Sequence, residues 1–179
     1  KDPDDNSKGR IYGAISGWEV DIVMREKYKF YGLNENYNYF DPGSEAASVA
    51  AIASAYNKGQ PVVSYHWDPT WLTGKLDLVL LEDAPYDPEL YPLGQTECPS
   101  MNITICVSNE FYEKAPEYAE FLSKYRTSSA LTAEALAYIE DNDASLEDAA
   151  KWFLTEHDEL IDQWLPEDKA ELVRNKLSQ

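Results

Sequence analysis

Short apolar segments alternate with helical patterns through the first 67 residues, and this alternation limits the possible folds more than any other feature of the chain. Residues 10–15, 36–40 and 61–67 are typical of short buried strands, and the stretches between them are typical of helices. Strands that are joined through helices pair in parallel and carry those helices on the faces of the sheet. The pattern therefore predicts an α/β fold with a mostly parallel sheet, to which residues 76–82 add a fourth strand.

Start and stop signals give the boundaries of the first two helices. Ser16 is predicted to cap the first helix, because Glu19 stands three residues later at the capping-box position. This helix is predicted to run to Phe30. An alanine-rich helix is predicted over residues 46–57, and Gly59 is its stop signal.

The second half of the chain changes in character after a proline-rich stretch, residues 84–99. Beyond it, one apolar strand is predicted over residues 102–107. Helices are predicted over residues 109–125, 132–142, 145–155 and 166–177. We therefore predict two parts: an α/β lobe with its crossing segment over residues 1–93, and one strand with helices over residues 94–179.

The strand predicted over residues 102–107 has no partner in its own half of the sequence. An apolar strand with an unpaired edge promotes association with other chains. Self-association through this strand, or a role as a protein-interaction module, therefore stays open.

Acidic side chains dominate the charged residues. The 179 residues include 33 Asp and Glu against 15 Lys and Arg, which gives a formal net charge of −18. Because a nucleic-acid-binding surface requires a basic footprint, no nucleic-acid partner is expected. The acidity indicates a solvated surface with a weak attraction for cations. No apolar run reaches the roughly 20 residues that span a bilayer, so no transmembrane segment is predicted.

The two cysteines, Cys98 and Cys106, are too few for a disulfide framework. They stand eight positions apart, so a bridge between them requires the chain to fold back on itself. A bridge and a pair of free, packed thiols both stay open.

Two of the five tryptophans follow predicted strands. Trp18 comes shortly after the first strand, and Trp67 ends the third. Ligands of open α/β sheets bind beyond the carboxyl ends of the strands, and aromatic faces attract diffuse positive charge. The sequence therefore predicts an aromatic-walled pocket for a ligand with a diffuse positive charge. The other three tryptophans, Trp71, Trp152 and Trp164, are predicted to pack in the protein interior.

The sequence around these two tryptophans resembles a known family. The stretch Lys-Gly-Gln-Pro-Val-Val over residues 58–63, the Trp-Asp-Pro-Thr-Trp motif over residues 67–71 and the Gly-Trp at residues 17–18 are similar to the glycine betaine/proline betaine substrate-binding proteins of ABC importers. The resemblance extends from about Arg10 to Leu177. It implies a type II periplasmic-binding-protein-like fold, in which two α/β lobes joined by crossing strands close on the ligand.

The resemblance also implies that part of this fold is absent from the chain. The chain resembles the second lobe followed by the carboxyl-terminal return into the first lobe, so the amino-terminal part of the first lobe is missing. That gap explains the unpaired strand. It also agrees with a start at Lys1 without an initiator methionine, which indicates a boundary made by cleavage or cloning.

By resemblance, the ligand-binding residues lie in the two tryptophan segments. Trp18 and Trp67 form two walls of a cage for the quaternary ammonium, and a third aromatic belongs to the missing lobe. The backbone N–H groups of Glu19 and Val20, which follow Gly17 at a helix start, bind the ligand carboxylate. The segment before Trp67 contributes two flanking candidates, Tyr65 and His66.

Glu19 departs from the pattern of relatives that place small residues after the tryptophan. Its carboxylate repels a bound anion if it turns inward, so we expect it to point outward or to serve the helix cap. Choline-like ligands, which lack a carboxylate, and other cationic amines or amino acids therefore stay open.

The resemblance implies an extracytoplasmic receptor, periplasmic or lipid-anchored, that delivers a quaternary ammonium osmolyte to the permease subunits of an ABC importer. Binding of this kind is not catalytic and requires no metal and no organic cofactor. A small-molecule enzyme of the α/β class is the alternative, since His66, His157 and many carboxylates can support acid–base chemistry. The sequence contains no nucleophile elbow, no phosphate-binding loop and no metal-spaced His or Cys cluster.

Overall fold

The computed structural model describes residues 1–178, which form two compact units. The first unit contains residues 1–67 and 76–100. The second contains residues 68–75 and the chain from residue 101 onward. The predicted division of the chain into lobes over residues 1–93 and 94–179 stays a prediction, because it concerns a longer two-lobed protein.

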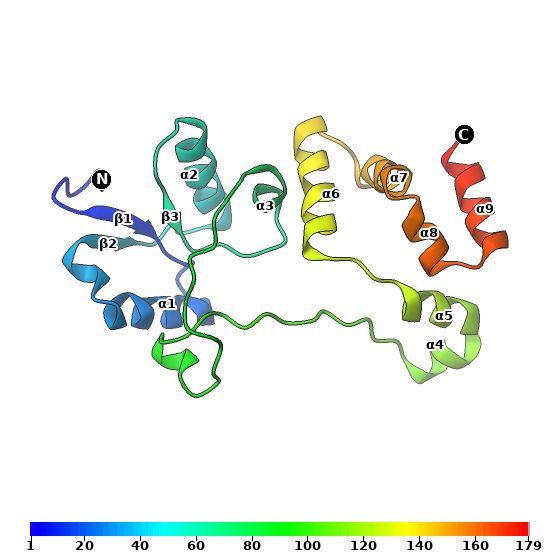
Figure 1. The fold of residues 1–179 in the computed structure, drawn as a ribbon, viewed down its shortest axis with the longest axis horizontal. Helices are drawn as coiled ribbons and strands as arrows, with labels where there is room; N and C mark the ends of the chain where they lie inside the picture. Colours follow the sequence, from blue (N-terminus) through cyan, green and yellow to red (C-terminus); the bar gives the residue numbers. More distant parts are fainter. Residues whose placement is uncertain (179) are drawn as a thin grey trace. The chain divides into compact units, whose positions relative to one another are not determined.

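A three-stranded parallel sheet forms the centre of the first unit (Figure 1). Strand β1 (Gly9–Tyr12) lies between β2 (Tyr37–Phe40) and β3 (Val63–Ser64). Ile11 is buried and pairs in register with Tyr39 on one side and Val63 on the other. The α/β class and the parallel pairing predicted from the sequence are confirmed, although β3 is shorter than the seven residues predicted.

Two helices connect the three strands. Helix α1 (Glu19–Phe30) joins β1 to β2, and α2 (Glu45–Asn57) joins β2 to β3. Because the strand order places β2 and β3 on opposite sides of β1, right-handed crossovers put the two helices on opposite faces, as Figure 1 shows. Each helix has a buried apolar side chain, Val23 in α1 and Ile52 in α2.

Ser16 does not cap α1, so that prediction is wrong, whereas a serine side chain does cap α2. The N-cap residue of α1 is Trp18, and no side chain caps the helix. Gly17 adopts a positive φ of 95°, which continues the turn past Ser16 and delays the helix by two residues. Ser44 caps α2, and its hydroxyl accepts a hydrogen bond of 3.2 Å from the N–H of Ala47.

Two other predicted strands are wrong. Within residues 1–178, neither residues 76–82 nor residues 102–107 pair as strands, and Figure 1 draws both stretches as irregular chain. Leu80 is 88% exposed and Ile103 is 94% exposed. An apolar, β-branched sequence favours an extended backbone, but it becomes a strand only when another strand completes its hydrogen bonds.

The proline-rich segment packs against α1 within the first unit. The ammonium of Lys27 donates a hydrogen bond of 2.6 Å to the carbonyl of Thr96 and pairs with the carboxylate of Asp83. Gly94 ends a short 3₁₀ helix, η2 (Tyr91–Leu93), in a left-handed conformation with φ 68°. A Cβ atom at Gly94 would lie 2.1 Å from the backbone nitrogen of Lys27, so only glycine permits this approach.

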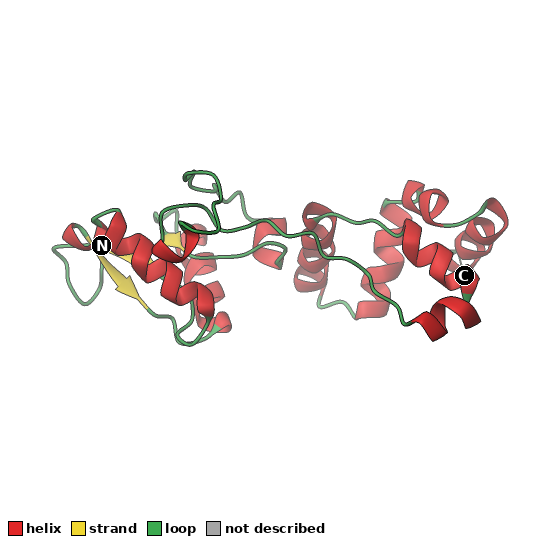
Figure 2. Cartoon of the chain, turned by 90° about the horizontal axis from the view of Figure 1, so that it is seen from below, coloured by secondary structure: helices red, strands yellow, loops and turns green. Residues whose placement is uncertain are grey.

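The second unit consists of helices and loops within the described residues, and Figure 2 shows strands only in the first unit. Its helices are α3 (Trp71–Lys75), α4 (Asn109–Lys114), α5 (Pro116–Lys124), α6 (Ser129–Asn142), α7 (Leu146–Glu156), α8 (Glu159–Trp164) and α9 (Glu167–Leu177). The helix predicted over residues 109–125 is broken at Ala115, because the following Pro116 disfavours a helical conformation there. The sequence prediction missed α3 and α8, which are short.

Close helix contacts form the core of the second unit. Helix α3 packs against α6, where Gly74 approaches the backbone of Ala133 and Leu72 is fully buried. The rings of Trp152 and Tyr138 stack with their centroids 4.1 Å apart. These contacts agree with the predicted packing role of Trp152, and the same holds for Trp164, which is 5% exposed and lies against Tyr125.

Candidate aromatic ligand site

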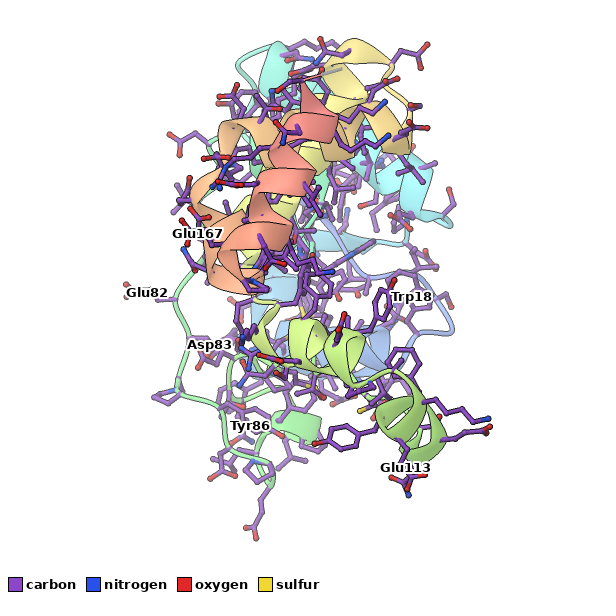
Figure 3. All side chains as sticks on the ribbon, turned by 90° about the vertical axis from the view of Figure 1, so that its right-hand side faces the viewer. Trp18, Glu82, Asp83, Tyr86, Glu113 and Glu167 are labelled. Atoms are coloured by element: carbon purple, nitrogen blue, oxygen red, sulfur yellow. The ribbon has the colours of Figure 1, made fainter. Side chains whose placement is uncertain are left out.

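The indole rings of Trp18 and Trp67 contact each other at the carboxyl edge of the sheet. Their centroids are 5.3 Å apart and their planes make an angle of 62°, so the rings meet edge to face at a corner. Trp18 is 38% exposed and is labelled in Figure 3. Trp67 is half-buried. The structure therefore brings together the two tryptophans predicted to line the site, and it buries neither of them completely.

The turn between β1 and α1 places Trp18. The N–H of Trp18 donates to the carbonyl of Ile15 over 3.1 Å, and the N–H of Asp21 donates to the carbonyl of Trp18 over 3.1 Å. Gly17 supplies the positive φ, and nothing lies within 4 Å of the position that its Cβ would occupy. The space is open at Gly17, so backbone conformation is what requires glycine there.

The phenol of Tyr39 braces this turn from β2. Its oxygen accepts a hydrogen bond of 3.1 Å from the N–H of Ala14 and donates one of 2.8 Å to the buried carboxylate of Asp21. Burial and the Asp21 carboxylate raise the pKa of Tyr39 above its ordinary value, so the phenol stays protonated and remains a donor.

The chain after β3 places Trp67 and its two neighbours. The N–H of Tyr65 donates to the carbonyl of Tyr12 over 2.7 Å, which extends the pairing with β1 by one residue. The ring of Trp67 lies 6.1 Å from that of Tyr65 and 5.1 Å from that of His66. We refer to Trp18, Tyr65, His66 and Trp67 as the aromatic cluster.

Backbone amides lie directly beside the aromatic cluster. Helix α1 begins at Glu19, and the first N–H groups of a helix have no intrahelical partner. The N–H groups of Glu19 and Val20 therefore remain available to an anion, and the helix dipole favours negative charge at this end. Since Trp18 is the N-cap residue, its indole ring and the amides of Glu19 and Val20 come from consecutive residues.

Tyr91 and Cys98, which the sequence analysis did not select as site residues, lie within electrostatic range of Tyr65, and Tyr91 also lies within range of Glu19. Burial, the Cys98 thiol and the charges of Tyr65 and Glu19 together raise the pKa of Tyr91 to about 12. Burial and then Cys98 raise the pKa of Tyr65 as well. The position of Tyr91 depends on the attachment of the proline-rich segment to α1 through Lys27, which no local pattern signals.

Both cysteines are free, and their side chains are exposed. The structure thus contains no Cys98–Cys106 bridge. His157, the other histidine, lies in the second unit with its Nε2 atom 3.1 Å from Glu134. Among residues 1–178, no group of three or more His, Cys, Asp or Glu side chains is arranged to hold a metal ion. None of the helices described is long and apolar enough to cross a membrane.

Comparison with protein families identifies the family of this chain. Residues 1–156 match a family model described as the substrate binding domain of the ABC-type glycine betaine transport system. The chain is 26% identical over 72 residues to the glycine betaine/proline betaine-binding periplasmic protein of Salmonella typhimurium, an alignment that covers 40% of this chain and 22% of that protein.

Two solved structures share the fold. The glycine/betaine/L-proline-binding protein ProX of Borrelia burgdorferi superposes with a TM-score of 0.55 at 18% identity, over 92% of this chain and 58% of that one. Lactococcal OpuAC, in its closed-liganded conformation complexed with glycine betaine, superposes with a TM-score of 0.53 at 22% identity, over 90% and 63%. The chain therefore spans less than two thirds of each of these relatives.

Proposed function

The chain belongs to the family of substrate-binding domains of ABC-type glycine betaine transport systems, and on that premise we propose that it forms part of an extracytoplasmic receptor for quaternary ammonium compounds. The preferred ligands are glycine betaine and proline betaine. The observation that carries the proposal is the contact between Trp18 and Trp67 beside the free amides at the start of α1.

The aromatic cluster suits the cationic end of a betaine. A quaternary ammonium has no N–H to donate, so it is held by aromatic faces and by exclusion of water from its methyl groups. The corner between the rings of Trp18 and Trp67 offers two such faces. Each is worth on the order of 0.5–2 kcal/mol, depending on how completely the cation is desolvated. Tyr65 and His66 extend the aromatic surface on the Trp67 side.

The start of α1 suits the anionic end of the same ligand. The amides of Glu19 and Val20 can donate to a carboxylate without a positive side chain that would compete for the cation. The space beside Gly17 is open, because no atom lies within 4 Å of the position that its Cβ would occupy. One turn and one strand end thus supply complementary groups to both charges of a zwitterion.

We propose that the chain binds its ligand without catalysing a reaction, since the family consists of substrate-binding domains. We propose that the receptor delivers its ligand to the membrane subunits of an ABC permease. The Salmonella relative is named a periplasmic protein, and we propose a periplasmic or lipid-anchored location for this one. Residues 1–93 are proposed to belong to one lobe and residues 94–179 to the return into the other.

The exposed apolar stretch over residues 102–107 supports a further proposal about partners. Ile103 is 94% exposed and Ile105 is 48% exposed, and the backbone there pairs with no strand of residues 1–178. We propose that this stretch pairs with another strand and that the isolated 179-residue chain self-associates through it. Size-exclusion chromatography against concentration tests this, and a monomer at every concentration contradicts it.

Calorimetry on the full-length protein tests the proposed ligand class. Glycine betaine should bind and should also perturb tryptophan fluorescence, because Trp18 and Trp67 line the proposed site. The carbon isostere 3,3-dimethylbutanoate has the same shape and carboxylate without the positive charge, so it should bind at least tenfold more weakly if the aromatic faces recognise charge. Equal affinity for the two compounds, or no binding of any quaternary ammonium, would exclude the proposed mechanism.

A further inference from the structure

The side chain of Glu19 brings a negative charge to the edge where the proposed ligand presents its own carboxylate. Glu19 is the first residue of α1, directly follows Trp18 and is exposed. Because Trp18 is the N-cap residue, Glu19 is the first residue of the helix and does not occupy the third position that the suggested capping box requires. Glu19 therefore contributes two groups to the proposed site: a backbone N–H that can donate to the ligand carboxylate and a side chain that carries a negative charge.

Covalent geometry keeps this charge close to the site whichever rotamer the side chain adopts. The carboxyl carbon of a glutamate lies at most about 5 Å from its own backbone nitrogen, given ordinary bond lengths. An anion that accepts a hydrogen bond from that nitrogen lies about 2.9 Å away from it. The ligand carboxylate and the Glu19 carboxylate are then separated by about 8 Å or less, which is within the screening length of physiological salt.

The basic residues of α1 are already paired with other acids. Arg25 donates to the carboxylate of Asp21 over 2.9 Å. Lys27 pairs with Asp83 and with the carbonyl of Thr96. Lys29 pairs with the carboxylate of Glu26 over 2.7 Å, so the ion pairs of these three basic residues all go to acids other than Glu19.

The groups around Glu19 at the sheet edge supply no fixed compensating positive charge. The phenols of Tyr65 and Tyr91 and the thiol of Cys98, which lie within electrostatic range of one another, can be neutral or negative but never positive. His66 lies in the aromatic cluster with its ring 5.1 Å from Trp67.

We propose that Glu19 is a specificity-determining residue of the proposed site, whose carboxylate lowers the affinity for ligands that carry a carboxylate relative to quaternary ammonium cations that carry none. This inference rests on the proposed function. The charge attracts the ammonium of both classes of ligand, but it repels the carboxylate of the zwitterion alone. Glu19 therefore raises the affinity for choline-like cations relative to the affinity for betaines.

Calorimetry on the full-length protein at pH 8 and low salt tests this inference with glycine betaine and choline as probes. Glu19→Gln keeps the backbone amide and removes the charge. It should shift the ratio of the two dissociation constants by about three- to tenfold in favour of glycine betaine, as expected for one charge at this range in a partly solvated site. Glu35→Gln is the matched control, because Glu35 is exposed and precedes β2, at the opposite edge of the sheet. It should leave the ratio unchanged.

A salt series on the unaltered protein provides a second measurement that does not depend on the folding of a variant. Raising the salt from about 0.05 M to about 0.5 M shortens the screening length and weakens the repulsion between Glu19 and the ligand carboxylate. The ratio of the two dissociation constants should therefore shift in favour of glycine betaine. A ratio that neither Glu19→Gln nor salt changes, with both ligands still bound, overturns this inference and leaves the proposed function intact. Failure of the unaltered protein to bind either ligand overturns both.

Discussion

The phenol of Tyr39 joins Asp21 to Ala14: it donates to the Asp21 carboxylate over 2.8 Å and accepts from the Ala14 N–H over 3.1 Å. Asp21 and Ala14 are both buried, and Tyr39 satisfies the Oδ1 atom of Asp21 and the N–H of Ala14, while Arg25 pairs with the other carboxylate oxygen. The same ring fills the space above Gly13, where a Cβ would lie 2.0 Å from it. The turn that carries Trp18 is thus held from both ends by one side chain of β2.

Replacing this phenol should destabilise the first unit. Tyr39→Phe leaves a buried carboxylate and a buried N–H without their common partner, which costs about 1–3 kcal/mol. Denaturant unfolding measures the loss. The control is Tyr37→Phe, an exposed tyrosine two residues earlier on the same strand, which should change stability by less than about 0.5 kcal/mol. Equal stability of the two variants would show that the Tyr39 hydroxyl contributes nothing to this turn.

Removing one wall of the proposed cage should weaken ligand binding. Trp67→Ala in the full-length protein should raise the dissociation constant for glycine betaine at least tenfold, because about 1–2 kcal/mol or more of cation–π contact and burial is lost. Calorimetry measures the constant. Trp152→Phe changes a tryptophan that stacks on Tyr138 in the second unit, and it should leave the affinity unchanged. Unaltered affinity in Trp67→Ala would remove this residue from the site.

Gly94 should tolerate substitution less well than another left-handed glycine. Gly94→Ala places a Cβ 2.1 Å from the nitrogen of Lys27, so η2 must move away from α1. Gly59→Ala is the matched control, since Gly59 has φ 62° and nothing within 4 Å of its Cβ position. The control should cost about 1 kcal/mol from backbone strain alone. Thermal unfolding should show a clearly larger loss for Gly94→Ala, and equal losses would contradict the close packing of η2 on α1.

Acid should destabilise the first unit through Asp2. Hydrogen bonds from the N–H of Asp4, the amide of Asn38 and the guanidinium of Arg10 lower the pKa of Asp2 from 3.8 to about 2. Because folding lowers the pKa of Asp2, its ionised carboxylate stabilises the folded state at pH values above the ordinary aspartate pKa. This stabilisation is lost as the pH falls from about 4 to about 2. Asp2→Asn should be less stable than the unaltered protein at neutral pH.

The stability gap between the unaltered protein and Asp2→Asn should narrow over that acid range. Unfolding measured at several pH values between 2 and 7 tests the shape of this difference. Asp77→Asn, at an exposed position of the first unit, should show a flat difference. A constant gap for Asp2→Asn would mean that its carboxylate is not specifically stabilised in the folded state.

The sequence predicted the local elements of the first unit because their signals are local. Apolar periodicity located β1 and β2, and the alanine-rich pattern over residues 46–57 located α2 to within one residue of its observed start. The parallel pairing followed from the alternation of strands and helices. The α1 cap was mispredicted because Ser16 satisfies the capping pattern, whereas the positive φ of Gly17 moves the helix start to the far side of Trp18.

The sequence by itself determined that the chain alternates strand and helix, and that two tryptophans follow strands which end at one edge of a sheet. Only the tertiary structure decided which apolar stretches become strands, because residues 76–82 and 102–107 have β-forming sequences without a pairing strand among the residues described. It also decided that Tyr91 reaches the edge of the aromatic cluster, since that position depends on contacts of Lys27 and Gly94 between segments more than 60 residues apart in the chain. Backbone periodicity is a local property, whereas strand pairing and the placement of a loop side chain require partners that are distant in sequence.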